Sequence, residues 1–306
     1  MATAARKLDK RHSQQSGHAD NIPPIVAGAA MVPVVTSALP GSEDRILSAL
    51  SCNSLTNTIM AGFIRDNGFG SLLNRGRFYT CRDEKNELEG VALVGHTILF
   101  EAFSDRAIQA FAALARRQSS SHLLMGEHSA VERFWSHYAG EDESPRLICP
   151  ILFLKRTEQF SEQPEVSGLR PAGREDLEHV VHAQAAMAFE ISGVDPLKKD
   201  PAGFRERYLN RIAKKRVWVV IENDRLLFKA DIIADTPQAS YLEGIYVSPE
   251  ERGKGVGRRC VMGLSRVLMA LGKAIYLFVE TQNTRTKSFY LKLGFTITGQ
   301  YDLLYF

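Results

Sequence analysis

The chain has 306 residues, of which 44% are apolar and 24% charged. This composition is typical of a folded globular protein and excludes disordered, collagen-like and disulfide-scaffold chains. The length is twice that of a typical domain of ~150 residues, so we expect two domains. A net charge of +3, from 38 Lys and Arg against 35 Asp and Glu, is too small for the strongly basic surface of a nucleic-acid-binding protein.

The beginning of the chain carries no chemistry that the sequence identifies, and we expect residues 1–40 to be a poorly ordered tail. The apolar stretch 22–39 contains three prolines, so it lacks the ~20 uninterrupted apolar residues of a membrane-spanning helix. No CxxC pair occurs among the four cysteines, which are Cys52, Cys81, Cys149 and Cys260. We therefore expect reduced thiols in a cytoplasmic protein, with no metal site and no membrane contact.

Apolar periodicity in the first half predicts a helix near Ile46, strands over 77–82, 90–100 and 147–154, and a helix over 105–117. A polar run over 157–168 reads as a linker. The boundary therefore separates a domain over 41–162 from one over 163–306.

The second half begins with a helix that contains the apolar residues from Leu177 to Ala188. A second helix follows Asp200, which is suited to cap it, and Pro201. The remaining elements are a hairpin over 217–222 and 226–234 with the two-residue turn Asn223-Asp224, a strand over 240–247, a helix containing Val261 to Leu271, a strand over 274–280 and a helix over 284–293.

The run Pro-Glu-Glu-Arg-Gly-Lys-Gly-Val-Gly-Arg-Arg, residues 249–259, lies between a predicted strand and a predicted helix. Glycines there let main-chain N–H groups approach an anion, and the helix N-terminus adds roughly half a positive charge. A pyrophosphate group is the natural ligand, although a flexible basic turn is the alternative. Neither GxxxxGK[ST] nor GxGxxG fits the run, which excludes a P-loop and a Rossmann dinucleotide site.

The run matches the Arg-x-x-Gly-x-Gly signature of the GNAT acetyltransferase superfamily at Arg252, Gly255 and Gly257. Residues 241–247 resemble the family's fourth strand, and residues 283–295 are similar to its Asn and Tyr-x-x-x-Gly-Phe element. The resemblance covers roughly 166–306. It implies an α/β fold of the α+β type, with a central mixed, mainly antiparallel sheet flanked by helices.

By this resemblance the cofactor is acetyl-CoA, held where the fourth and fifth strands splay apart. The implied cofactor-binding residues are Ile245, Tyr246, Val247, Arg252, Gly253, Lys254, Gly255, Val256, Gly257, Arg258 and Asn283. Tyr290 would protonate the departing thiolate, with a core aromatic as the alternative. Asn283 is equally suited to be a helix N-cap.

Acetyl transfer to nitrogen requires a neutral amine, so a base is expected. Glu243 is the best candidate because it lies on the strand that should pass the thioester, and a solvated carboxylate is the alternative. Asp231 and Glu190 are weaker candidates. The loop over 191–199, which contains Asp195, would shape the acceptor pocket by resemblance. His179 and His182 lie three apart on a helix without a third metal ligand, so we interpret them as surface residues.

The order of predicted elements over 77–154 is similar to that of the second half, which indicates tandem GNAT-like domains. Residues 101–107 replace the glycine run with a glycine-free segment containing two acids, so we expect this lobe to be degenerate. We predict an N-acetyltransferase that transfers acetyl from acetyl-CoA to a primary amine of a small molecule or peptide. The alternative is a non-catalytic acyl-CoA-binding regulatory protein; the acceptor and the oligomeric state stay open.

Overall fold

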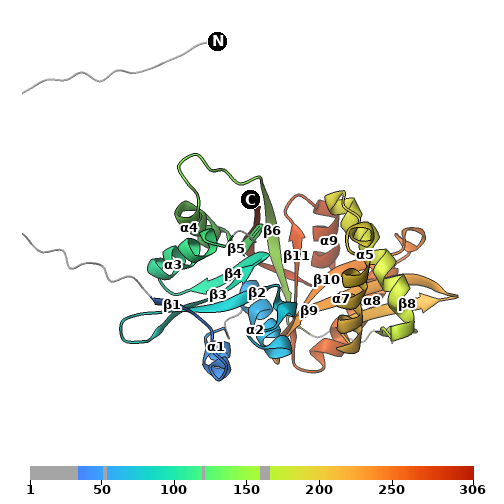
Figure 1. The fold of residues 1–306 in the computed structure, drawn as a ribbon. Coiled ribbons are helices and arrows are strands. Elements are labelled where there is room, and N and C mark those ends of the chain that lie inside the picture. The colour runs from blue at the N-terminus through green and yellow to red at the C-terminus, as the bar shows by residue number, and fades with distance from the viewer. Residues whose placement is uncertain (1–33, 51–53, 119–120, 159–165) are drawn as a thin grey trace, which may run out of the picture. The chain divides into compact units, whose positions relative to one another are not determined.

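The structure is a computed structural model that describes residues 34–50, 54–118, 121–158 and 166–306 (Figure 1). Its first half contains, in order, β1 (Val34–Ser37), α1 (Glu43–Ala49), α2 (Leu55–Asn67), the 3-10 helix η1 (Leu72–Asn74), β2 (Gly76–Arg82), β3 (Leu88–Gly95), β4 (Thr97–Ala102), α3 (Asp105–Arg116), β5 (Leu123–Glu127), α4 (His128–Tyr138) and β6 (Leu147–Arg156).

The second half contains β7 (Arg170–Pro171), η2 (Arg174–Asp176), α5 (Leu177–Ser192), α6 (Pro196–Lys199), α7 (Pro201–Ala213), β8 (Val217–Glu222), β9 (Arg225–Asp235), β10 (Ala239–Val247), η3 (Pro249–Glu251), α8 (Val256–Met269), β11 (Ala274–Glu280), α9 (Thr284–Lys292) and β12 (Thr296–Tyr305). Within the described residues, no helix has both the length and the apolar character that crossing a membrane requires.

Local signals in the second half are confirmed in detail. The Asp200 side chain accepts the Gly203 N–H and caps α7. Asn223 and Asp224 both have positive φ, as a two-residue hairpin turn requires. In the first half, the strand predicted over 90–100 is wrong as a single element, because the chain turns at His96 between β3 and β4.

Part of the predicted tail is a strand. Residues 34–37, inside the tail expected over 1–40, form β1 and pair antiparallel with β2. Residues 1–33 lie outside the described residues, as does most of the predicted linker, residues 159–165. The boundary at 162/163 stays a prediction.

Twelve strands of the described chain form one sheet in the order β1-β2-β3-β4-β5-β12-β6-β11-β10-β9-β8-β7. The mixed, mainly antiparallel α/β architecture expected for each half is present, since only β4 with β5 and β10 with β11 are parallel pairs. The sequence did not predict that the two halves share one continuous sheet.

The sheet is continuous because the halves exchange strands. The first half's β6 pairs antiparallel with β11 of the second half over 151–156 and 275–280. In return, β12 at the end of the chain pairs with β5 over 301–305 and 123–127. These exchanged strands also pair with each other. Three strand pairs among the described residues therefore join the two halves.

Helices cover both faces of the second half. On one face, α5 and α7 pack on β8 through Val180, Val181, Phe204 and Tyr208. The core formed by α8 and α9, which includes Leu264 and Phe295, packs on β9, β10 and β11. The sheet around β9 is thus covered by α5 and α7 on one face and by α8 and α9 on the other.

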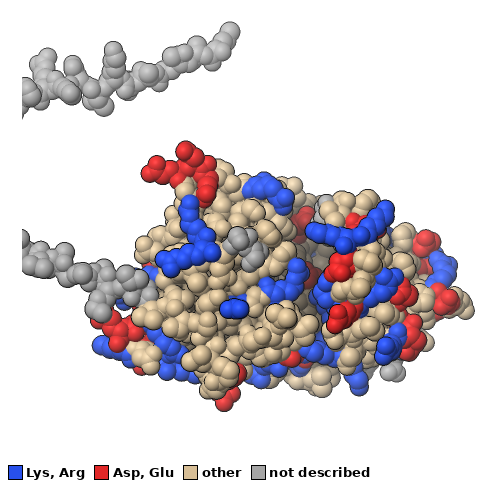
Figure 2. All heavy atoms as spheres, viewed as in Figure 1, with Lys and Arg blue, Asp and Glu red and all other residues tan. Residues whose placement is uncertain are grey.

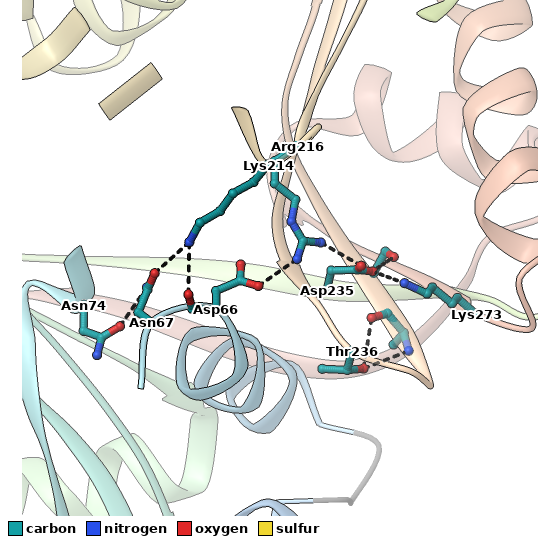
Figure 3. A network of polar contacts seen from close by, with 10 residues as sticks. Asp66, Asn67, Asn74, Lys214, Arg216, Asp235, Thr236 and Lys273 are labelled. Atoms are coloured by element: carbon teal, nitrogen blue, oxygen red, sulfur yellow. Dashed lines mark hydrogen bonds and ion pairs between the residues drawn. The ribbon is translucent and has the colours of Figure 1, made fainter. Parts of the chain in front are cut away.

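Helix α2 belongs to the first half by sequence but packs on the second. Its Ile59 and Met60 share a core with Ala234 and Tyr241 of β9 and β10. Asp66 at its end forms an ion pair with Arg216 at 2.8 Å, and Arg216 in turn contacts Asp235 at 2.7 Å (Figure 3). This contact places the end of α2 beside the segment that joins α7 to β8.

The approach of α2 to β9 requires glycine at position 62. A Cβ there would lie 2.7 Å from the Ala234 Cβ and 3.1 Å from the Asp235 N, and backbone atoms cannot move aside easily. We predict that Gly62→Val lowers the free energy of unfolding by about 1–3 kcal/mol, the usual cost of overpacking. Gly70→Val, where a Cβ meets open space, is the control and stays close to wild type. Urea denaturation measures both, and equal stabilities would contradict the described packing.

Candidate active site

Strands β10 and β11 diverge in the middle of the second half. They pair in parallel only between Ala239–Tyr241 and Ala274–Tyr276, although β10 continues to Val247 and β11 to Glu280. The expectation that the fourth and fifth strands splay apart is confirmed. Past Tyr241, the facing backbone edges are not paired with each other, so an extended, amide-containing arm can bind between them like an added strand.

A bulge interrupts β10 at the point of divergence. The pairing with β9 shifts between Glu243 and Tyr246, so that Gly244 and Ile245 face the single residue Ala230. Gly244 has φ of +59°, and a Cβ on it would lie 3.0 Å from Lys229 Nζ and Asp231 Oδ2. The role of Gly244 was not predicted, although an isolated glycine within a strand pattern signals a bulge. Such a bulge leaves a backbone group unpaired beside the splayed strands.

The glycine run forms a bend directly before α8. Gly253 and Gly255 both have φ of +81°, a conformation that favours glycine, and Gly255 is the N-cap of α8. Because no side chain caps this helix, its first N–H groups are available to an anion. A Cβ on Gly257 would lie 2.9 Å from Val247 Cγ2, so glycine there lets α8 start close against the end of β10.

Beneath the bulge lies a buried ion pair that the sequence did not predict. Lys229 and Asp231 of β9 are almost inaccessible to solvent, with Lys229 Nζ 2.8 Å from Asp231 Oδ1. The Lys229 ammonium also donates to the Gly244 carbonyl at 3.1 Å. The Tyr208 hydroxyl donates to Asp231 Oδ2 at 3.1 Å, and Arg211 Nη1 lies 3.5 Å from the same oxygen.

Glu243 lies opposite Asp231 in the strand pairing but its side chain is exposed to solvent. Surrounding protein raises the pKa of Glu243, and the charge of Arg211 partly offsets this effect. Its side chain also reaches water, so the desolvation is partial. The result is a carboxylate with an increased proton affinity at the bulge, as a general base requires.

The other two candidate bases are placed less well. Asp231 is committed to the ammonium of Lys229 and to Tyr208, so protonating it would leave a buried positive charge unbalanced. Glu190 is exposed near the C-terminal end of α5. The geometry therefore favours Glu243, and its role as base stays a prediction.

Asn283 is the N-cap of α9, and its Oδ1 accepts the Thr286 N–H at 3.0 Å. The capping alternative is thus confirmed, and a role toward a cofactor stays a prediction. Tyr290 is buried in the core beside Phe289 and Phe295, and burial raises the pKa of its hydroxyl. Tyr290 therefore keeps its proton at neutral pH, which both the acid role and the core role allow.

The loop predicted over 191–199 is shorter in the structure, because α5 extends to Ser192 and Pro196–Lys199 form the short helix α6, whose N-cap is Asp195. His179 Nε2 lies 3.0 Å from the Asp224 carbonyl oxygen, and His182 lies 3.6 Å from Glu178. Among the described residues, no group of three or more His, Cys, Asp or Glu is arranged to hold a metal ion.

In the first half, the equivalent place has different contacts. Strands β4 and β5 pair in parallel only at 97–98 and 123–124, and Phe100 then stacks on Phe134 at 5.1 Å between ring centroids. The Ser104 hydroxyl accepts the Ala107 N–H and caps α3, and Asp105 forms an ion pair with Arg133 at 2.7 Å. No glycine bend exposes the first turn of α3.

Comparison with known families identifies the second half. Residues 187–295 match the model of the acetyltransferase (GNAT) family. The second half of the chain carries a GNAT domain. The match includes the bulge, the glycine bend and α9, and the family transfers acyl groups.

Solved structures share the fold over most of the chain. A GNAT-family acetyltransferase from Colwellia psychrerythraea is 14% identical with a TM-score of 0.54, covering 89% of this chain and 99% of its own. A tandem GNAT protein from the clavulanic acid biosynthesis pathway is 11% identical with a TM-score of 0.57, covering 89% and 97%. A Drosophila protein is 11% identical with a TM-score of 0.67, covering 90% and 99%. The tandem GNAT fold therefore extends over both halves. The search of curated proteins gives no match.

The buried ion pair should stabilise the protein only while both partners are present. We predict that Asp231→Asn lowers the free energy of unfolding by about 3–5 kcal/mol, because the Lys229 ammonium loses its counter-charge. The double variant Lys229→Met with Asp231→Asn should recover most of this loss. Asp200→Asn, at an exposed cap, is the control and should change little. If the double variant were as unstable as the sum of both single changes, the pair would not be coupled.

Proposed function

We propose that the chain is an N-acetyltransferase that moves acetyl from acetyl-CoA to a primary amine by direct attack. The observation that carries the proposal is the position of an exposed carboxylate, Glu243, at a strand bulge where β10 and β11 diverge. The uncapped first turn of α8 starts beside the same end of β10.

The residues fit the proposed cofactor. Main-chain N–H groups from Arg252 to Gly257 would hold its pyrophosphate, with Lys254 and Arg258 adding positive charge. Residues 245–247 would pair with the pantetheine arm along the free edge of β10. Acetyl-CoA would supply an activated thioester there. We propose that only the second half binds it, because Ser104 already caps the equivalent helix in the first half.

Two side chains of the protein would transfer protons during the reaction. A lysine-like amine with a pKa of ~10.4 costs about 4–5 kcal/mol to deprotonate at pH 7, and Glu243 would accept this proton directly or through water. The neutral nitrogen would then attack the thioester carbonyl, an amide would form as the carbon–sulfur bond breaks, and the second proton lost by the nitrogen would pass to solvent. Tyr290, whose hydroxyl is protonated at neutral pH, would give a proton to the thiolate and recover one from solvent.

The second candidate function is an acyl-CoA-binding regulatory protein without turnover. The exposure and raised pKa of Glu243 favour the enzyme, since a binding protein has no use for a base at the thioester. Measuring both turnover and binding on the same variants distinguishes the two functions, because only the enzyme releases thiol from acetyl-CoA.

Cofactor binding depends on the start of α8. We predict that Gly255→Asp weakens coenzyme A binding by roughly tenfold or more, because it places a negative charge at the helix N-terminus and strains a left-handed residue. Gly272→Asp is the control, since Gly272 has φ of +78° and no neighbour within 4 Å. It adds the same charge and comparable strain after the other end of α8. Calorimetry on both folded variants gives the comparison; equal affinities would exclude this anion site.

Turnover depends on Glu243. We predict that Glu243→Gln lowers turnover by about 10²- to 10⁴-fold near neutral pH, with partial recovery at high pH where more amine is neutral. In the wild type, turnover should rise with pH through the raised pKa of Glu243, because only its deprotonated form accepts a proton. Thiol release from acetyl-CoA measures both profiles. Wild-type rates in Glu243→Gln across the pH range would reject Glu243 as the base.

A further inference from the structure

Positive side chains from both halves meet beside the candidate base. Arg207 and Arg211 lie one turn apart on α7, and Arg211 reaches the buried Asp231 opposite Glu243. Arg75 ends η1 of the first half, and Lys199 ends α6. Figure 2 shows Lys and Arg atoms gathered where the two halves meet on the face that carries α2 and α7. We call Arg75, Arg207, Arg211 and Lys199 the basic cluster.

Hydrogen bonds between the halves fix Arg75 beside α7. Lys214, one residue past α7, donates to Asn67 Oδ1 at 2.8 Å, and Asn67 donates to Asn74 Oδ1 at 2.9 Å (Figure 3). Arg75 follows Asn74 directly and has φ of +54°, a left-handed conformation that few non-glycine residues adopt. Its carbonyl accepts the His96 N–H at 3.0 Å. The backbone therefore holds Arg75 in one unusual position.

The charges in the basic cluster act on one another. Burial and the charges of Arg207 and Arg211 lower the pKa of Arg75. Burial lowers the pKa of His96, and the charges of Arg75, His122 and Lys199 lower it further. This side chain is therefore mostly neutral at pH 7. Cations gathered from separate elements repel each other, and the fold tolerates the arrangement at an energetic cost.

The carboxylates nearby do not balance the cluster. Arg207 contacts Asp200 at 3.1 Å, in an exposed pair that is weakened by solvent, and Arg211 shares Asp231 with Lys229. In the part of the chain that the structure describes, Arg75 forms no ion pair with a carboxylate. Arg75 and Arg207 are thus available to an anion from solution, and Arg211, one turn from Arg207, reaches Asp231 opposite Glu243.

We propose that the acceptor is an amine that also carries a carboxylate or phosphate group, and that Arg75 and Arg207 bind this group. The inference rests on the proposed acetyltransferase function and adds the class of acceptor. Guanidinium groups suit both anions because they donate two parallel hydrogen bonds. The amine end of the same molecule would then face Glu243. The first half would contribute to acceptor recognition through Arg75, although it holds no cofactor.

The test uses the full chain, acetyl-CoA and two matched pairs of amines. Phosphoethanolamine is paired with ethanolamine, and L-phenylalanine with 2-phenylethylamine. We expect the anionic member of at least one pair to have the higher kcat/KM, and the pair concerned tells phosphate from carboxylate. In Arg75→Gln and Arg207→Gln, the ratio of kcat/KM within that pair should fall about tenfold, mainly through KM, as for loss of one charge-assisted hydrogen bond.

The control variant is Arg106→Gln, whose arginine pairs with Glu89 in the first half outside the basic cluster. It should keep the wild-type ratio. If the uncharged amines are acetylated and the ratio of kcat/KM within each pair is the same in Arg75→Gln and Arg207→Gln as in the wild type, the inference is overturned and the proposed function stands. If no amine is acetylated, calorimetry on the coenzyme A-saturated protein decides: binding of an anionic amine that is lost in Arg75→Gln supports the inference, and absence of such binding overturns it. Failure to bind coenzyme A would instead reject the proposed function.

Discussion

The exchange of β6 and β12 is the constraint on which the rest of the molecule depends. A splayed strand such as β11 has one edge turned toward the gap, so its other edge must be paired firmly to stay in place. That partner is β6, which comes from the first half of the chain, and Arg156 at its end donates to the Leu293 carbonyl at 2.8 Å. The gap between β10 and β11 is therefore supported by both halves. It follows that the second half is not a self-contained unit, whatever its sequence boundary.

The same exchange gives the first half a structural role in the second. Because β12 returns to pair with β5, the two lobes form one sheet, and α2 is held against β9 and β10. The network from Lys214 through Asn67 to Asn74 then fixes η1 beside α7 (Figure 3). In our account the first half lacks the phosphate-binding bend but supplies strand β6, helix α2 and Arg75 of the basic cluster to the site of the second half.

Charge is arranged at two depths around the bulge. Lys229 and Asp231 neutralise each other in the interior, where an unpaired charge would be very costly. Lys229 also donates a hydrogen bond to the Gly244 carbonyl, which ties the bulge of β10 to the neighbouring strand β9. Glu243 lies at the surface of this arrangement, exposed enough to exchange a proton and enclosed enough for the protein to raise its pKa. The difference between Asp231 and Glu243 is one of burial and partners, since both are carboxylates on paired strands.

Sequence reasoning succeeded where the signal was local. The glycine bend, the Asn223–Asp224 turn and the caps at Asp200 and Asn283 are each determined by a few neighbouring residues, and all are present. Helix α2 was missed because its buried face includes Thr56, Asn57 and Thr58, which obscures the apolar period. The strand exchange was missed because the sequence of a strand does not show which half of the chain provides its pairing partner. Lys229 was missed because only the tertiary structure buries it.

The central claim is that one half binds an acyl-CoA and the other half completes the site around it. A calorimetric titration of the full chain with coenzyme A tests this claim most directly, because it counts sites without requiring the acceptor. Our account predicts one molecule of coenzyme A per chain. Two molecules per chain would contradict the assignment of the first half as degenerate, and the absence of binding would contradict the assignment of the site itself.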